Sequence, residues 1–324
     1  MFKHLENNVK ETIDKGLYNP RNEHDACGIG FVANIKNKKS HQIIKDGLSI
    51  LENLTHRGAV GADPKAGDGC GLLTQIPDEF LRKVTAELGV ELPSLGRYGV
   101  GNIFLPKEKK KRENYIEQIK KIVENENLKI LALRDIPVNN NGLGYSVKPT
   151  EPFHLQMFVA SGEELSDQNA LERKLFVTRK NIYRMFLGDQ SKPLDDFYMC
   201  SLSSKTLLYK GMLLSDQLAE YFLDLNDPLF KSALALVHQR FSTNTFPTWD
   251  LAQPFRYMCH NGEINTFKGN TSRMRSREEL FSSMHISEEE MSEILPIIVP
   301  NKSDSASMDM VVELLLMTGR SFPE

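Results

Sequence analysis

Short apolar runs typical of strands alternate with amphipathic helical segments along almost the whole of this 324-residue chain. The first such pair is a strand-like run at 28–36 followed by a helical segment that Ser40 can cap and Gly58 can end. No repeat, low-complexity tract or clear linker interrupts the alternation. The pattern therefore predicts one large domain of mixed α+β class.

The same periodicities predict the remaining elements. Strands are expected at 72–76, 98–105, 128–138, 153–160, 233–238 and 254–259, and a hairpin is expected from the strands 197–201 and 206–210. Helices are expected at 78–89, between 105 and 128, and at 169–187, 271–281, 287–295 and 307–318.

Composition excludes several classes of protein. With 40% hydrophobic and 26% charged residues and a formal net charge of −3, the chain gives no reason to expect nucleic acid or an anionic membrane as a partner. It has no apolar run long enough to span a bilayer, and residues 1–26 lack the apolar centre of a secretory signal, so we expect a cytoplasmic location. Cys27, Cys70, Cys200 and Cys259 show no regular spacing, which predicts neither a disulfide framework, an iron–sulfur cluster nor a metal site.

Cys27 follows a polar leader and comes directly before the first expected strand. We interpret residues 1–26 as a propeptide removed on maturation, which leaves 27–324 as the folded domain. A cysteine that becomes the first residue carries a thiol and a free α-amine, and so is a nucleophile with its own base. Most lone cysteines are instead small buried apolar side chains, so position alone does not assign this role.

Three polar, glycine-rich runs follow: HRGAVGADPKAGDG from His56, HQRFSTNTFPTWDLAQPF from His238 and HNGEINTFKGN from His260. Together with Cys27-Gly28 they resemble the class II glutamine amidotransferases, and in particular the glutaminase domain of the glutamate synthase large subunit. The similarity covers the chain from about residue 23 to its end. It implies the N-terminal nucleophile fold, a four-layer αββα sandwich with two mainly antiparallel sheets between helix layers.

The resemblance also implies catalytic roles. Hydrolysis of a carboxamide needs a nucleophile, a proton shuttle and stabilisation of an oxyanion. Cys27 supplies the first two once the Ala26–Cys27 bond is cut, because a free α-amine has a reference pKa of about 8. By resemblance, the side-chain amide of Asn261 and the backbone N–H of Gly262 hold the oxyanion. A tight turn is the competing interpretation of this Asn-Gly pair.

The residues implied to bind L-glutamine lie in two places. Arg240 corresponds to the arginine that binds the α-carboxylate, a task that suits its planar guanidinium. The wall of the site is formed by Phe241, Ser242 and Thr243. Asp304 corresponds to the aspartate that binds the substrate ammonium, and capping of the helix expected near Ser307 is its competing role.

In this family the glutaminase forms a glutamyl thioester and passes ammonia to a synthase region, where 2-oxoglutarate becomes glutamate with electrons from FMN and an iron–sulfur cluster. The chain itself implies no cofactor and stops soon after its last expected helix, which suggests a fragment or one subunit of a split enzyme. Implied partners are a synthase region or subunit and an electron-donating subunit or ferredoxin. A free-standing glutaminase and a silent glutamine-binding module remain alternatives. Cys70 stands where alanine is more usual, which leaves open a second thiol near the site.

Overall fold

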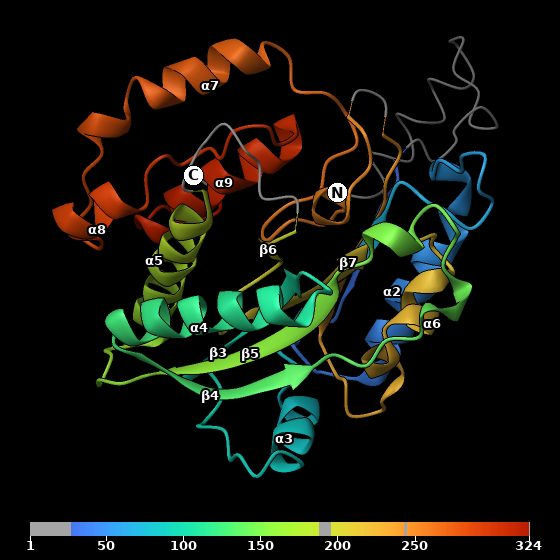
Figure 1. Ribbon diagram of the computed structural model, residues 1–324, viewed down its shortest axis with the longest axis horizontal. Coiled ribbons are helices and arrows are strands. Elements are labelled where there is room, and N and C mark those ends of the chain that lie inside the picture. The colour runs from blue at the N-terminus through green and yellow to red at the C-terminus, as the bar shows by residue number, and fades with distance from the viewer. Residues whose placement is uncertain (1–26, 188–195, 243–244, 324) are drawn as a thin grey trace, which may run out of the picture.

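Two stacked antiparallel sheets form the centre of the computed structural model, which describes residues 27–187, 196–242 and 245–323 (Figure 1). The first sheet has the strand order β1-β8-β2-β7, with bounds Ile29–Ala33, Leu234–Gln239, Cys70–Gln75 and Thr206–Gly211. The second has the order β4-β5-β3-β6, with bounds Leu128–Asp135, Phe153–Ser161, Tyr98–Leu105 and Tyr198–Met199. This confirms the predicted α+β class with two antiparallel sheets.

Helices cover both outer faces of the sheets. The first sheet packs against α2 (His41–Asn53), and the second against α4 (Lys109–Asn125) and α5 (Gln168–Leu187) (Figure 1). The other α-helices are α3 (Asp78–Ala86), α6 (Gln217–Tyr221), α7 (Phe267–Arg275), α8 (Glu288–Glu293) and α9 (Asp304–Met317). Short 3-10 helices lie at Thr55–Arg57, Asn140–Gly142, Lys148–Thr150, Leu223–Asn226, Trp249–Leu251 and Glu278–Leu280.

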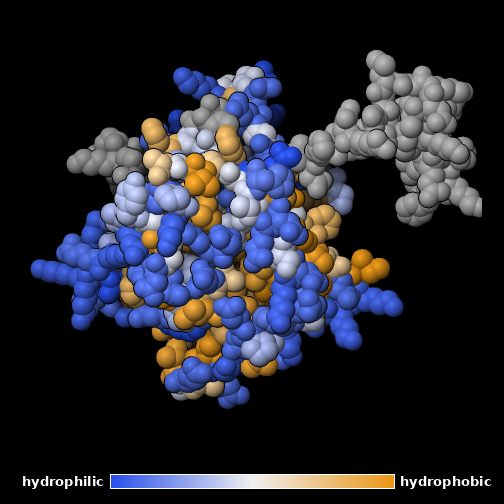
Figure 2. All heavy atoms as spheres, turned by 90° about the vertical axis from the view of Figure 1, so that its right-hand side faces the viewer, coloured by the Kyte–Doolittle hydropathy of each residue, from blue (hydrophilic) through white to orange (hydrophobic). Residues whose placement is uncertain are grey.

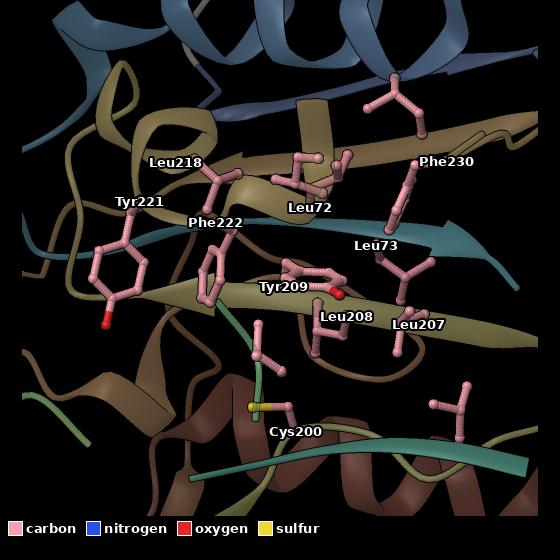
Figure 3. Packing of buried hydrophobic residues seen from close by; sticks show 14 of the residues in the cluster. Leu72, Leu73, Cys200, Leu207, Leu208, Tyr209, Leu218, Tyr221, Phe222 and Phe230 are labelled. Carbon is pink, nitrogen blue, oxygen red and sulfur yellow. The ribbon is translucent and has the colours of Figure 1, made fainter. Parts of the chain in front are cut away.

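The main core lies between the sheets because alternate residues of each strand point to opposite faces. In β5, Phe158 belongs to this core, whereas Met157 and Val159 pack with α4 and α5 in a second core. On the facing sheet, the ring of Tyr209 contacts Phe222 and Phe230 at centroid distances of 5.0 and 5.8 Å (Figure 3). The strand alternation predicted from the sequence therefore builds an inter-sheet core and a separate helix-facing core.

The helices α8 and α9 pack against α5 instead of a sheet (Figure 1). Phe176 and Val177 of α5 form an apolar cluster with residues of α8, α9 and the segment between them. A buried ion pair between Arg179 and Glu313 also joins α5 to α9. These contacts fix the first residue of α9, Asp304, relative to the sandwich.

Two predicted elements are wrong. The strands at 197–201 and 206–210 do not form a hairpin, because β6 pairs with β3 in the second sheet while β7 pairs with β2 in the first. No strand forms at 254–259, although Phe255 and Arg256 are buried. There the carboxylate of Asp309 accepts the backbone N–H groups of Arg256, Tyr257 and Met258 at 3.3, 2.8 and 3.2 Å. A side chain thus replaces the neighbouring strand as the hydrogen-bond partner.

Two helix starts also differ from the prediction. The helix expected at 307–318 begins at Asp304, because Ser303 occupies the N-cap and its Oγ accepts the N–H of Ala306 at 3.2 Å. The helix expected at 271–281 begins at Phe267 and ends at Arg275. Asp304 is therefore inside the first turn of its helix and does not act as the cap.

The molecular surface seen from the side of α2 is mainly hydrophilic, with apolar residues in several separate areas (Figure 2). Across the part of the chain that the structure describes, each helix is too short or too polar to cross a lipid bilayer.

The inter-sheet core predicts a large loss of stability on truncation of Phe158, which is fully buried. Phe158→Ala should lower the free energy of unfolding by about 3–5 kcal/mol, because it removes apolar contacts and leaves a cavity. The matched control is Phe31→Ala in β1, a side chain that is 68% exposed and whose loss should cost less than about 1 kcal/mol. Urea unfolding followed by circular dichroism measures both, and equal losses would contradict the assigned core.

Candidate functional site

Pairing of β1 with β8 places Cys27 beside the end of β8. The N–H of Gln239 donates to the carbonyl of Gly28 at 2.7 Å, and the Cys27 side chain is exposed. A Cβ on Gly28 would lie 2.3 Å from the carbonyl oxygen of Gln239 and 3.3 Å from Oδ1 of Asn261. A residue with a side chain would collide with this backbone, so glycine lets Cys27, β8 and Asn261 meet.

Arg240 follows β8 directly and is 5% exposed. Its backbone N–H donates to the carbonyl of Gly69 at 2.8 Å, and its Nη2 donates to Oγ1 of Thr245 at 2.8 Å. Burial lowers the pKa of the guanidinium below its usual value, while Asp68 and Asp250 act in the opposite direction. Because the side chain keeps its charge and its Nη1 finds no hydrogen-bond partner among the described residues, Arg240 can bind an anionic group.

The glycine-rich run before β2 holds the segment after Arg240. Gly69 has a φ of +121°, and a Cβ there would lie 2.8 Å from that of Ala252. The preceding Asp68 accepts the N–H of Ser242 at 2.5 Å. Phe241, between Arg240 and Ser242 in the sequence, is largely exposed. The structure thus places Phe241 and Ser242 beside Arg240, whereas Thr243 lies outside the described residues.

Asn261 and Gly262 lie in an exposed, irregular segment between the 3-10 helix at Trp249–Leu251 and α7. Oδ1 of Asn261 is 2.8 Å from Nε2 of His238 in β8. Burial lowers the pKa of His238 to about 4, so its ring is neutral near pH 7. An amide oxygen only accepts, hence the ring donates from Nε2 and the Nδ2 amide group of Asn261 remains available as a donor.

Asp304 contacts the same irregular segment from the other side. Its Oδ2 accepts the N–H of Ile264 at 2.6 Å, and its Oδ1 accepts the N–H of Ser305 at 2.6 Å. A cavity of about 270 Å³ between α7 and α9 is lined by Asp304, by Ile264 and by a mixture of apolar and polar side chains that includes Arg273 and Arg277. The carboxylate therefore lies at the edge of a cavity and contacts the backbone of Ile264, three residues after Asn261.

Buried polar atoms without a hydrogen-bond partner cluster near the end of β8 and Asn261. Among the described residues, eleven buried side-chain nitrogen or oxygen atoms lack a hydrogen-bond partner. Five of them belong to Arg57, His238, Gln239, Arg240 and His260, which all lie next to β8 or Asn261. Buried polar groups are normally paired, so a cluster of unpaired ones is typical of a site that binds a polar ligand.

Two residues of the site were not singled out by sequence reasoning. They are His238 and Gln253. The Oε1 atom of Gln253 accepts the N–H of His260 at 2.8 Å, and its Nε2 donates to the carbonyl of the same residue at 3.1 Å. For His238, the sequence did contain a signal, namely a histidine near the end of an otherwise apolar strand. Gln253, in an irregular run, gave no comparable signal.

Burial distinguishes Cys27 from Cys70, the second thiol considered near the site. Cys70 pairs with Gln239 across β2 and β8, yet it is fully buried and its Sγ donates to the carbonyl of Leu214 at 3.3 Å. Burial raises the pKa of the Cys70 thiol and raises those of Cys200 and Cys259 to about 12. No group of three or more potential metal ligands occurs among residues 27–187, 196–242 and 245–323. Of the four cysteines, Cys27 is therefore the exposed one, and Cys70 is buried beside the end of β8.

Comparison with known proteins shows the family of this chain. Residues 27–324 match the family model described as "Glutamine amidotransferases class-II". The chain is 45% identical over 306 residues to a glutamate synthase [NADPH] large chain of Bacillus subtilis, covering 94% of this chain and 20% of that protein. It is 43% identical over 316 residues to a glutamate synthase [NADH] of Schizosaccharomyces pombe, covering 96% of this chain and 15% of that protein. It is also 40% identical over 299 residues to a ferredoxin-dependent glutamate synthase 2 of Synechocystis, covering 92% of this chain and 19% of that protein. The chain thus spans a fifth or less of these relatives.

The differences in burial predict selective alkylation. With iodoacetamide at pH 8, we expect Cys27 to react at least about tenfold faster than Cys70, because alkylation requires an accessible thiolate. Peptide mass mapping of the folded protein measures each rate, and the same reaction in urea serves as the control in which the rates should converge. Equal labelling of Cys27 and Cys70 in the folded protein would contradict the assignment.

Proposed function

Since the chain belongs to the class II glutamine amidotransferases, we propose that it hydrolyses the side-chain amide of L-glutamine with Cys27 as the nucleophile. The observation that carries the proposal is the cation of Arg240, which is buried beside β1 and β8 and keeps an unpartnered Nη1. That group fits the α-carboxylate of an amino acid. The family match, which begins at Cys27, supports the choice of nucleophile.

The base in this proposal is the α-amine of Cys27 itself. In the printed sequence that nitrogen is part of the peptide bond with Ala26, so the bond must be cut before the amine can accept a proton. A free α-amine has a reference pKa of about 8 and is partly unprotonated near neutral pH. His238 does not take this role, because its Nε2–H is engaged with Asn261 and burial lowers the pKa of the ring to about 4, which makes its free nitrogen a weak base.

The substrate is held at both ends of its amino acid group. Arg240 binds the α-carboxylate, and Asp304 binds the α-ammonium through Oδ2, which accepts the N–H of Ile264, whereas Oδ1 accepts both the N–H and the hydroxyl of Ser305. The side chain of glutamine then extends toward Cys27. Its amide oxygen meets the Nδ2 group of Asn261 and the N–H of Gly262.

The reaction begins when the Cys27 thiol transfers its proton to the α-amine and its sulfur attacks the amide carbon. The C–S bond forms, and the carbonyl electron pair moves to the oxygen held by Asn261 and Gly262. When the intermediate collapses, the C–N bond breaks and the α-ammonium gives its proton to the leaving nitrogen, which departs as ammonia. Water, deprotonated by the amine, then attacks the thioester, and the C–S bond breaks to release glutamate.

The glutamate synthase relatives suggest where the ammonia goes. We propose that a synthase region or subunit outside this chain adds it to 2-oxoglutarate, and that an electron-donating subunit or ferredoxin reduces the product. FMN and the iron–sulfur cluster belong to that region. Four cysteines that lie apart do not fit a cluster bound by several thiolates together, so no step proposed for this chain involves it.

A glutamine-binding module without turnover is the second candidate, because the Cys27 nitrogen is still part of a peptide bond in the printed sequence. Intact-mass measurement separates the two proposals. We expect the purified wild-type protein to begin at Cys27 and Cys27→Ala to retain residues 1–26, if maturation depends on the same thiol.

Glutaminase activity should fall by more than about a thousandfold in Cys27→Ala, since no nucleophile remains. Activity in that variant equal to wild type would contradict the mechanism.

Arg240 should control substrate binding. We expect Arg240→Lys to raise the KM for L-glutamine by roughly 10- to 100-fold, because a charge-assisted pair is worth about 1.5–3 kcal/mol and an ammonium cannot reproduce two-pronged binding. Arg97→Lys, at an exposed arginine that donates to the carbonyl of Leu165, is the matched control and should leave KM unchanged. Steady-state kinetics on the matured protein measure both. An unchanged KM in Arg240→Lys would exclude the carboxylate role.

A further inference from the structure

The proposed oxyanion hole lies where regular structure provides the least support. Asn261 and Gly262 are exposed and belong to neither a helix nor a strand. An oxyanion hole works only if its donors are already in place when the charge develops, and a displacement of about 1 Å can cost roughly a hundredfold in rate. Some contact outside the hole must therefore hold these two residues.

His238 fixes the side chain of Asn261. It lies near the end of β8, is 1% exposed, and is held by strand pairing with β1 and β2. Its Nε2 donates to Oδ1 of Asn261 at 2.8 Å, which ties the acceptor end of the amide to the sheet. With Oδ1 held by the sheet, the donor end, Nδ2, is left available for a substrate oxygen.

Gln253 fixes the backbone directly before Asn261. Its side-chain amide accepts the N–H of His260 and donates to the carbonyl of the same residue, at 2.8 and 3.1 Å. Gln253 is 6% exposed, so it offers a buried anchor to an otherwise irregular chain. This pair of bonds resembles what a neighbouring strand would provide.

The two anchors act on different groups of one short segment, and Asp304 holds its far end through Ile264. We propose that His238 and Gln253 are positioning residues that hold Asn261 and Gly262 in the geometry needed to stabilise the oxyanion. The inference rests on the proposed glutaminase reaction. It assigns neither residue a contact with substrate, so their loss should affect kcat far more than KM.

His238 is tested with two variants of matched size. His238→Leu removes the donor, and we expect a fall in kcat of roughly 30- to 100-fold with a KM within threefold of wild type. In His238→Gln the side-chain amide reaches the position of Nε2 and can donate to Asn261, so kcat should recover at least tenfold relative to His238→Leu. Gln253→Met, similar in length but without the two hydrogen bonds, should also lower kcat with little change in KM.

A control separates positioning from stability. His154 is likewise buried, and its Nε2 lies 2.8 Å from the hydroxyl of Tyr221 outside the candidate site. His154→Leu should change kcat less than threefold when rates are divided by the concentration of folded sites, counted by alkylation of Cys27. The rate of that alkylation should be equal in wild type and His238→Leu, because the thiol itself is unchanged.

The outcomes distinguish the inference from the proposed function. If the matured wild-type protein hydrolyses no glutamine, the proposed function is wrong. If it is active but His238→Leu keeps kcat within threefold, or if His238→Gln fails to restore activity in a folded protein, the positioning role is wrong and the glutaminase assignment stands. Loss of kcat with rescue by His238→Gln supports the inference.

Discussion

The pairing of β1 with β8 is the constraint on which the rest of the site depends. The hydrogen bond from Gln239 to Gly28 sets the register that brings Cys27, two residues before β1, to Arg240, the residue after β8. A slip of one residue would turn every side chain of β1 to the opposite face of the sheet. Because a Cβ at Gly28 would lie 2.3 Å from the Gln239 carbonyl oxygen, the close approach tolerates only glycine. The proposed nucleophile and the proposed carboxylate binder thus depend on one backbone contact.

Around this strand pair, side chains supply hydrogen bonds that secondary structure usually supplies. Asp309 accepts three consecutive backbone N–H groups, Gln253 holds both polar groups of His260, and Asp304 holds Ile264. Each of these side chains is anchored by a buried position or a helix. An irregular segment can therefore be both ordered and accessible, which is what a site that must meet substrate requires.

Sequence patterns predicted the positions of helices and strands better than they predicted which strands pair with each other. Alternation in β5 and helical spacing in α2 are local, so both could be read from the chain. The pairing of β6 and β7 with different sheets could not, because the short loop between them is compatible with a hairpin. The missing strand at 254–259 was equally hidden, since Phe255 is buried as a strand residue would be and Asp309, some fifty positions away, accepts three consecutive N–H groups that a neighbouring strand would otherwise bind. His238 and Gln253 were missed for the same reason, because their importance lies in long-range contacts.

The charges around Arg240 explain why the proposed site would favour an intact amino acid. Taking a guanidinium out of water is costly, and neither Thr245 nor the Gly69 backbone neutralises its charge. A substrate carboxylate would offset this cost in a buried environment, where the attraction is stronger than in water. An amide without an α-carboxylate would leave the cation unpaired and would be bound poorly. Selection for glutamine over simpler amides therefore follows from a penalty against the wrong ligand as much as from attraction to the right one.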